Sequence, residues 1–221
     1  MLFDLRSRGR RRVVLVIYLG LALLMLGGLV LFGVGAGNGF GGLLNAFTNN
    51  GSGSNTGQVV DQAQKKALKA TRADPTSPSA WAALVTADFQ LAGEGSNYNS
   101  ATATYSADGK KVLTEATLAW QRYTALTKSP NQNIAILAAR AYAQTGQYAG
   151  AAEAWQDYTL AEPKQAKGYE CWAANAYAAK QTRTGDLASA KAISLAPKAE
   201  RLTLKQQLEE AKTSALVAQE C

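Results

Sequence analysis

The most continuous hydrophobic pattern in the chain is an apolar run near its start. Residues 13–34 read VVLVIYLGLALLMLGGLVLFGV and contain no charged side chain. As an α-helix these 22 residues would extend for about 33 Å at about 1.5 Å per residue, which matches a bilayer core of about 30 Å. A surface helix of a globular domain would carry a polar face, and this run has none. The pattern predicts one transmembrane helix over residues 13–34, in contact with the lipid bilayer.

The charges on either side of this run predict its orientation. Five arginines precede it within residues 1–12, whereas the first lysine after it is Lys65. Because basic residues favour the cytoplasmic side, residues 1–12 are predicted to be a cytoplasmic basic tip and the C-terminal part to be extracytoplasmic. A cleaved signal peptide is the alternative, but its apolar region is shorter and ends at a small-residue cleavage site. We therefore favour an uncleaved signal anchor in a single-pass protein of the cell membrane.

A stretch rich in Gly, Asn and Ser follows the run and predicts a flexible linker over residues 35–57. Gly33, Gly37 and Gly41 repeat at a spacing of four, which is typical of helix faces that dimerise in membranes. A homo-oligomer is therefore an open alternative to a loose helix end at this place.

Helical periodicity dominates residues 58–221, which we assign to one all-α domain. The clearest face has apolar side chains at i, i+3, i+4, i+7 and i+8: Ile134, Leu137, Ala138, Ala141 and Tyr142. Gly146 follows this face and can adopt the left-handed conformation that ends a helix. Further helices are expected over residues 59–73 and 200–219. The second of these has a polar outer side, as the last helix of a repeat array needs.

The same part of the chain repeats itself at a period near 35. Two matches share that shift: AWQRYT at 119–124 with AWQDYT at 154–159, and AYA at 141–143 with AYA at 176–178. Prolines fall at intervals of 33 and 34: Pro130, Pro163 and Pro197. An earlier unit starts at Ser77-Pro78, with proline just inside the helix. Its turn is expanded into a polar loop over residues 93–109. A period of this length is typical of helix–turn–helix repeats.

Residues 131–163 resemble one repeat of the tetratricopeptide (TPR) family. The resemblance is carried by an aromatic, a turn glycine, a second aromatic, a small residue, a third aromatic and a closing proline: Tyr142, Gly146, Tyr148, Ala151, Trp155 and Pro163. The chain departs from the family where Ala135 and Ala138 replace an early Trp and Leu. In the next unit Gly185-Asp186-Leu187 takes the place of the turn. The resemblance implies a short TPR-like α-solenoid whose stacked helix pairs form a groove for protein partners.

Polar residues on the first helix of each pair are the candidate groove residues that this resemblance implies. They are Asp88, Gln90, Asn133, Arg140, Glu170 and Asn175. We expect a membrane-tethered extracytoplasmic protein-interaction scaffold, with an assembly or quality-control role for envelope or secreted proteins as one specific version. A permanent structural subunit of a larger membrane complex is the alternative.

Charge and residue content exclude several other functions. The net charge is +7, but five of the 23 basic and one of the 16 acidic residues lie in residues 1–12, which leaves +3. Without a dense basic stripe we expect no nucleic-acid binding. The chain contains no histidine, which removes the commonest catalytic base and metal ligand. No nucleophile motif, phosphate loop or metal cluster is evident, so we expect no enzyme activity, no cofactor and no metal.

The two cysteines, Cys171 and Cys221, are too few for a zinc site. In an oxidising compartment they could form one disulfide if the last helix folds back beside the helix of Cys171. The alternative is a buried free thiol at Cys171 and a frayed thiol at Cys221, and we favour it slightly because chain ends are often poorly ordered.

Overall fold

A computed structural model describes residues 56–221. The predicted cytoplasmic tip, the predicted transmembrane helix and all but the last two residues of the predicted linker lie outside the described residues. Within residues 56–221, no helix has the length and apolar character needed to cross a bilayer.

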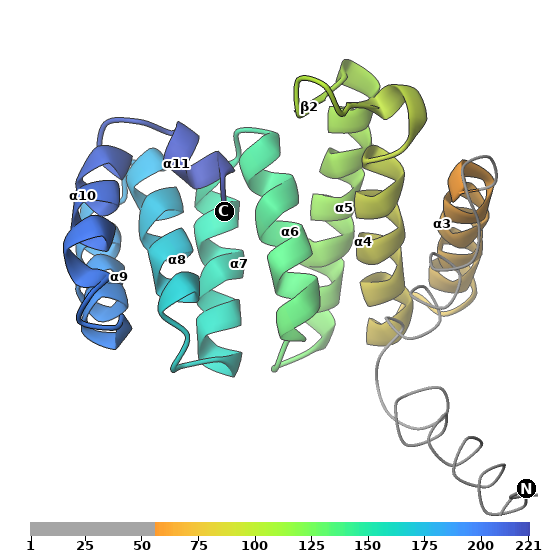
Figure 1. The fold of residues 1–221 in the computed structure, drawn as a ribbon. Helices are drawn as coiled ribbons and strands as arrows, with labels where there is room; N and C mark the ends of the chain where they lie inside the picture. Colours follow the sequence, from red (N-terminus) through yellow and green to blue (C-terminus); the bar gives the residue numbers. More distant parts are fainter. Residues whose placement is uncertain (1–55) are drawn as a thin grey trace, which may run out of the picture. The chain divides into compact units, whose positions relative to one another are not determined.

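The described residues form an all-α unit, which confirms the predicted fold class at that level. Its helices lie side by side in the order of the sequence, and neighbours along the chain pack as pairs (Figure 1). The longer helices are α3 (Thr56–Ala73), α4 (Pro78–Ala92), α5 (Ala107–Leu126), α6 (Gln132–Gln144), α7 (Tyr148–Ala161), α8 (Ala166–Ala178), α9 (Thr182–Leu195) and α10 (Arg201–Ala211). A last short helix, α11 (Leu216–Gln219), follows a turn.

Helix starts follow the capping pattern of the sequence. Ser77 caps α4 by accepting a hydrogen bond from the amide of Ala80, and Pro78 occupies the first turn, as predicted. Ser106 and Asn131 cap α5 and α6 in the same way. A side-chain oxygen that accepts an otherwise unpaired amide stabilises a helix start by about 1 kcal/mol.

Equivalent left-handed turns connect α6 to α7 and α8 to α9. Gly146 has a φ of 74°, as predicted, and Gln147 donates its amide to the carbonyl of Tyr142. Lys180 has a φ of 63°, and Gln181 donates to the carbonyl of Ala176. Both turns therefore have the hydrogen bonds of a Schellman motif.

The turn expected at Gly185-Asp186-Leu187 was wrong, because these residues lie within α9. Gly185 has a packing role instead: a Cβ there would come within 2.4 Å of the Tyr177 ring. Gly150 on α7 is similarly close to the Tyr142 ring, at 2.7 Å. A lysine occupies the left-handed position that glycine usually takes, which is why sequence reasoning placed the turn too late.

The polar loop between α4 and α5 is folded rather than open. A short 3₁₀ turn, Gly95–Asn97, precedes a small antiparallel hairpin. Its strands, β1 (Tyr98–Asn99) and β2 (Thr104–Tyr105), have two residues each, and Tyr98 pairs with Tyr105. The amide of Ser106 donates to the carbonyl of Asn97 at 2.8 Å, which holds the hairpin over the start of α5.

Large aromatic side chains and fully buried alanines make up the core. The aromatic residues repeat along the array: Trp120, Tyr142, Trp155 and Tyr177. Alanines pack between them where helices approach closely, for example Ala138, Ala139, Ala151 and Ala173, each with no exposed surface. Close packing of this kind leaves little room for a larger side chain.

The single helix expected over residues 200–219 was wrong. α10 ends at Ala211, and the chain turns through residues 212–215 before α11. α11 then packs on α6 and α8 rather than continuing along α9 (Figure 1). The hydroxyls of Thr213 and Ser214 bond to the main chain around this break, which favours a turn over a continuous helix.

Candidate functional site

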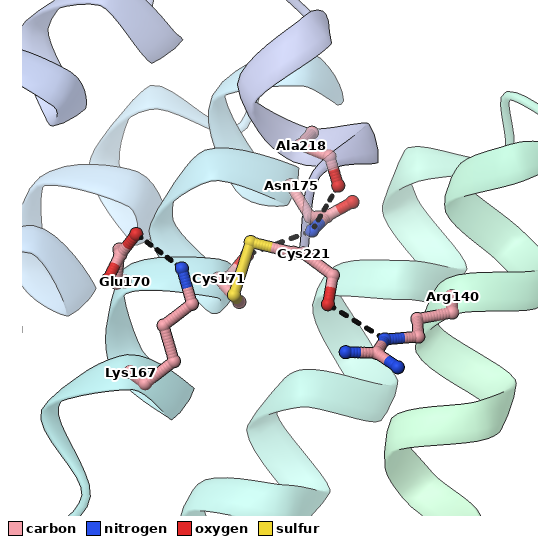
Figure 2. A network of polar contacts seen from close by, with 7 residues as sticks. All are labelled: Arg140, Lys167, Glu170, Cys171, Asn175, Ala218 and Cys221. Carbon is pink, nitrogen blue, oxygen red and sulfur yellow. Dashed lines mark hydrogen bonds and ion pairs between the residues drawn. A yellow bond between two sulfur atoms is a disulfide. The ribbon is translucent and has the colours of Figure 1, made fainter. Parts of the chain in front are cut away.

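The C-terminal segment, residues 216–221, lies across α6 and α8 (Figures 1 and 2). Residues separated by 43 to 81 positions in the sequence meet here. The segment therefore lies on α6 and α8, which are the first helices of the pairs α6–α7 and α8–α9.

Three side chains donate hydrogen bonds to main-chain carbonyls of this segment. Arg140 Nε donates to the carbonyl of Cys221 at 2.9 Å, and Gln144 Nε2 donates to that of Gln219 at 3.1 Å. Asn175 Nδ2 donates to that of Ala218 at 3.5 Å and to that of Cys171 at 2.9 Å. We call Arg140, Gln144 and Asn175 the carbonyl site. It binds main-chain atoms, so these hydrogen bonds do not use the side chains of the segment.

A disulfide joins Cys171 of α8 to Cys221 (Figure 2), with Cα atoms 5.5 Å apart. The sequence-based preference for free thiols at Cys171 and Cys221 was therefore wrong. The break after α10 allows the chain to fold back, which a continuous helix would have prevented. The disulfide closes a loop of 50 residues, for which loss of chain entropy in the unfolded state predicts a contribution of about 4 kcal/mol.

Two of the predicted groove residues, Arg140 and Asn175, belong to the carbonyl site. Glu170 lies on α8 near the disulfide, where its carboxylate pairs with Lys167 Nζ at 2.7 Å (Figure 2). Asn133 lies on α6 two turns before Arg140 and is exposed. Because positions seven apart share a helix face, Asn133 lies on the same side of α6 as Arg140.

The other two predicted groove residues lie on α4, away from the carbonyl site. Asp88 is 2% exposed and accepts a hydrogen bond from Gln64 Nε2 of α3 at 2.9 Å. Burial raises the pKa of the Asp88 carboxyl to about 7, the bond from Gln64 opposes that rise, and the charge of Glu115 adds to it. Gln90 is half-buried on the same helix. Asp88 therefore makes a polar contact between α4 and α3 and does not share a surface with Arg140.

Asn175 is fully buried, and its Oδ1 has no hydrogen-bond donor among residues 56–221. Both hydrogen bonds of the Asn175 side chain are donated by Nδ2 to carbonyl oxygens, and these partners fix the orientation of the amide. A buried acceptor without a donor costs about 1–3 kcal/mol. The carbonyl site therefore retains one unused hydrogen-bonding group.

A separate hollow of about 650 Å³ lies between α5, α6 and α7. Gln121 Nε2 donates to Tyr142 Oη at 3.1 Å on its wall. Glu153 and Asp157 also line it, and burial together with the charge of Glu153 raises the pKa of the Asp157 carboxyl. In the part of the chain that the structure describes, no three His, Cys, Asp or Glu side chains gather closely enough to hold a metal ion. The hollow contains none of the predicted groove residues.

Sequence reasoning missed three residues that contact across the site. Gln144 binds the segment directly, and Gln219 Nε2 donates to Tyr148 Oη at 2.9 Å. Gln144 follows Asn133 and Arg140 at the next i+4 position, so helical spacing alone could have added it to the groove list. No sequence feature indicated Tyr148 or Gln219, because their meeting depends on the chain reversal after α10.

Comparisons of the chain with protein-family models, curated protein sequences and solved structures give no match.

Proposed function

We propose that this protein is a membrane-tethered, extracytoplasmic protein-interaction scaffold whose residues 58–221 form a short TPR-like α-solenoid. One observation carries the proposal: the first helices of two successive pairs, α6 and α8, hold a peptide segment through donors aimed at its main-chain carbonyls. Recognition of main-chain groups supplies affinity that many partner sequences can share.

The location in the proposal rests on two independent features. Five arginines precede the apolar run of residues 13–34, and no basic residue follows it before Lys65, which favours export of the rest of the chain. The Cys171–Cys221 disulfide supports the same location, because structural disulfides persist mainly outside the reducing cytosol.

The experiment that tests the scaffold proposal is photo-crosslinking in intact membranes. A photo-reactive amino acid replaces Asn133, which is exposed on the same face of α6 as Arg140, and in a matched variant it replaces Gln156, exposed on α7. We expect one discrete protein to be captured from position 133 and not from position 156, with the crosslinked peptide identified by mass spectrometry.

Equal capture from both positions would instead support the alternative of a permanent subunit that is surrounded by other chains. Absence of capture from position 133 would contradict the scaffold proposal.

A further inference from the structure

The carbonyl site binds main-chain oxygens at the end of α11. Unpaired main-chain carbonyls of this kind are present at the end of every helix. The last four carbonyls of a helix have no partner within that helix. In α11 the carbonyls of Ala218 and Gln219 find donors on α8 and α6 instead, and Arg140 of α6 binds the main-chain oxygen of Cys221 just beyond the helix.

The side chains that the segment places against the site are small. Ala218 has no exposed surface, Cys221 is 6% exposed, and Val217 is half-buried against the core. Leu216 is 67% exposed, and Glu220 is also exposed. The site therefore selects a small residue at the position of Ala218 and also covers the side chains of Val217 and Cys221, whereas those of Leu216 and Glu220 remain free.

The segment is an incomplete ligand for this site. Its contact with Asn175 Nδ2 is long, at 3.5 Å, and Asn175 Oδ1 has no donor among residues 56–221. An occupant that supplies an N–H or O–H group to Oδ1 would remove the cost of that unpaired acceptor. A second polypeptide could thus bind the site more tightly, contact for contact, than the segment does.

The disulfide adds a covalent bond to the contacts that hold the segment. Residues 212–215 form the short connection from α10, and beyond it the segment is joined covalently to α8 at Cys171. A tethered ligand competes at an effective concentration of about the millimolar range, and a covalent bond prevents its departure altogether.

We propose that the carbonyl site is a receptor for the last helical turn of a partner protein, and that residues 216–221 are an internal occupant released when the Cys171–Cys221 disulfide is reduced. The partner presents unpaired main-chain carbonyls and a small residue at the position of Ala218. This inference rests on the proposed scaffold function and names the chemistry of its ligand.

Release requires a dithiol reductant and balances as an exchange of two electrons. One thiolate of the dithiol attacks the sulfur of Cys221, which is the less buried of the two cysteines, and Cys171 leaves as a thiolate that takes up a proton. The second thiolate of the reductant then attacks the first reductant sulfur, which is bonded to Cys221 in the mixed disulfide. Cys221 leaves and is protonated, and the reductant becomes a disulfide.

The test is a fluorescence-anisotropy titration in detergent, in which a labelled peptide binds either the full chain or a chain that ends at Ala211. The peptide has the sequence of residues 212–221 with Cys221→Ser, so that it cannot form a disulfide. We expect saturable binding to a chain that ends at Ala211, with or without dithiothreitol. The oxidised full chain is expected to bind at least about tenfold more weakly, and dithiothreitol to restore part of the difference, because the tethered segment still competes.

Two matched variants check where the peptide binds. In the chain that ends at Ala211, Arg140→Met is expected to weaken binding about tenfold or more, since a hydrogen bond to a charged group is lost. Arg122→Met, which changes an exposed arginine on α5, is expected to leave binding unchanged. Far-UV circular dichroism establishes that each variant is folded. If the shortened chain does not fold, the Cys171→Ser/Cys221→Ser variant replaces it and is expected to bind more tightly than the oxidised full chain.

The inference is overturned if neither the shortened chain nor the double serine variant, when folded, binds the peptide. It is also overturned if the oxidised full chain binds as tightly as the shortened one. Capture of a partner from position 133 without peptide binding would contradict this inference alone. Peptide binding without capture from either crosslinking position would instead contradict the proposed function in the cell.

Discussion

At the scale of single residues, Asp88 is a carboxyl group that is almost fully buried. It is buried between α3 and α4, and burial raises the pKa of its carboxyl to about 7 from 3.8. Between these two values the folded protein holds a proton that the unfolded chain has released. The contribution of Asp88 to stability is therefore present below about pH 4 and is lost as the pH rises through about 7.

We expect Asp88→Asn to stabilise the protein at high pH. The amide has the shape of the protonated acid, can still accept from Gln64, and carries no charge that burial would penalise. The free energy of unfolding at pH 8 should rise by up to about 4 kcal/mol, whereas at pH 4 it should change little. Urea denaturation at several pH values measures this difference.

Asp61→Asn is the matched control for this experiment. Asp61 lies on the same helix pair but at the surface, where it pairs with Lys65. Its substitution should alter the free energy of unfolding by less than about 1 kcal/mol at any pH. A loss of stability at pH 8 in Asp88→Asn would show that the charged carboxylate is favourable in the folded protein.

At the scale of elements, the turns between paired helices have one backbone geometry but different residues. Gly146 adopts the left-handed conformation in the α6–α7 turn without strain, whereas Lys180 adopts it in the α8–α9 turn. A residue with a Cβ pays about 1–2 kcal/mol for this conformation. The α8–α9 turn is therefore held by its hydrogen bonds and by the packing of the two helices rather than by local preference.

We expect Lys180→Gly to stabilise the protein and Gly146→Ala to destabilise it. The first relieves the strained backbone at the cost of a more flexible unfolded chain, for a net gain of about 0.5–1 kcal/mol. The second introduces the strain and should cost about 1 kcal/mol. Thermal denaturation of the two variants should give shifts of opposite sign. A lower melting temperature for Lys180→Gly would contradict the left-handed geometry at this turn.

At the scale of the whole molecule, the predicted anchor and the disulfide lead to the same prediction about the location of the C-terminal part. If residues 13–34 insert with the N-terminus in the cytoplasm, Cys171 and Cys221 reach an oxidising environment. If the chain stays in the cytosol, the same two cysteines remain reduced. The redox state of the cysteines therefore reports the orientation of the anchor.

We expect the full chain to stay in the membrane fraction after alkaline washing, and its cysteines to react with a maleimide polymer only after reduction. The matched variant Leu23→Arg/Leu24→Arg puts two charges into the apolar run, each costing about 3 kcal/mol for insertion. This variant should be released from membranes and should react at both cysteines without a reductant. Reaction of the unchanged protein without a reductant would contradict the proposed location.

The sequence by itself determined those features of the protein that depend on neighbours a few residues apart. Helical periodicity, the cap at Ser77-Pro78 and the left-handed Gly146 all follow from local rules, and the structure agrees with each within residues 56–221. The resemblance to the TPR family, together with the helix face, made Arg140 a candidate groove residue, although neither gave any indication of what it contacts.

Only the tertiary structure decided which distant residues meet. The break after α10 turns the chain back. The Cys171–Cys221 disulfide and the hydrogen bond from Gln144 to Gln219 then join positions 50 and 75 residues apart. The burial of Asp88 and Asn175 likewise depends on neighbouring helices that pack over them. A periodic pattern specifies which face of a helix is buried, but the neighbour that covers that face is selected by the packing of the whole array. The carbonyl site exists because that packing folds the C-terminal segment back onto α6 and α8.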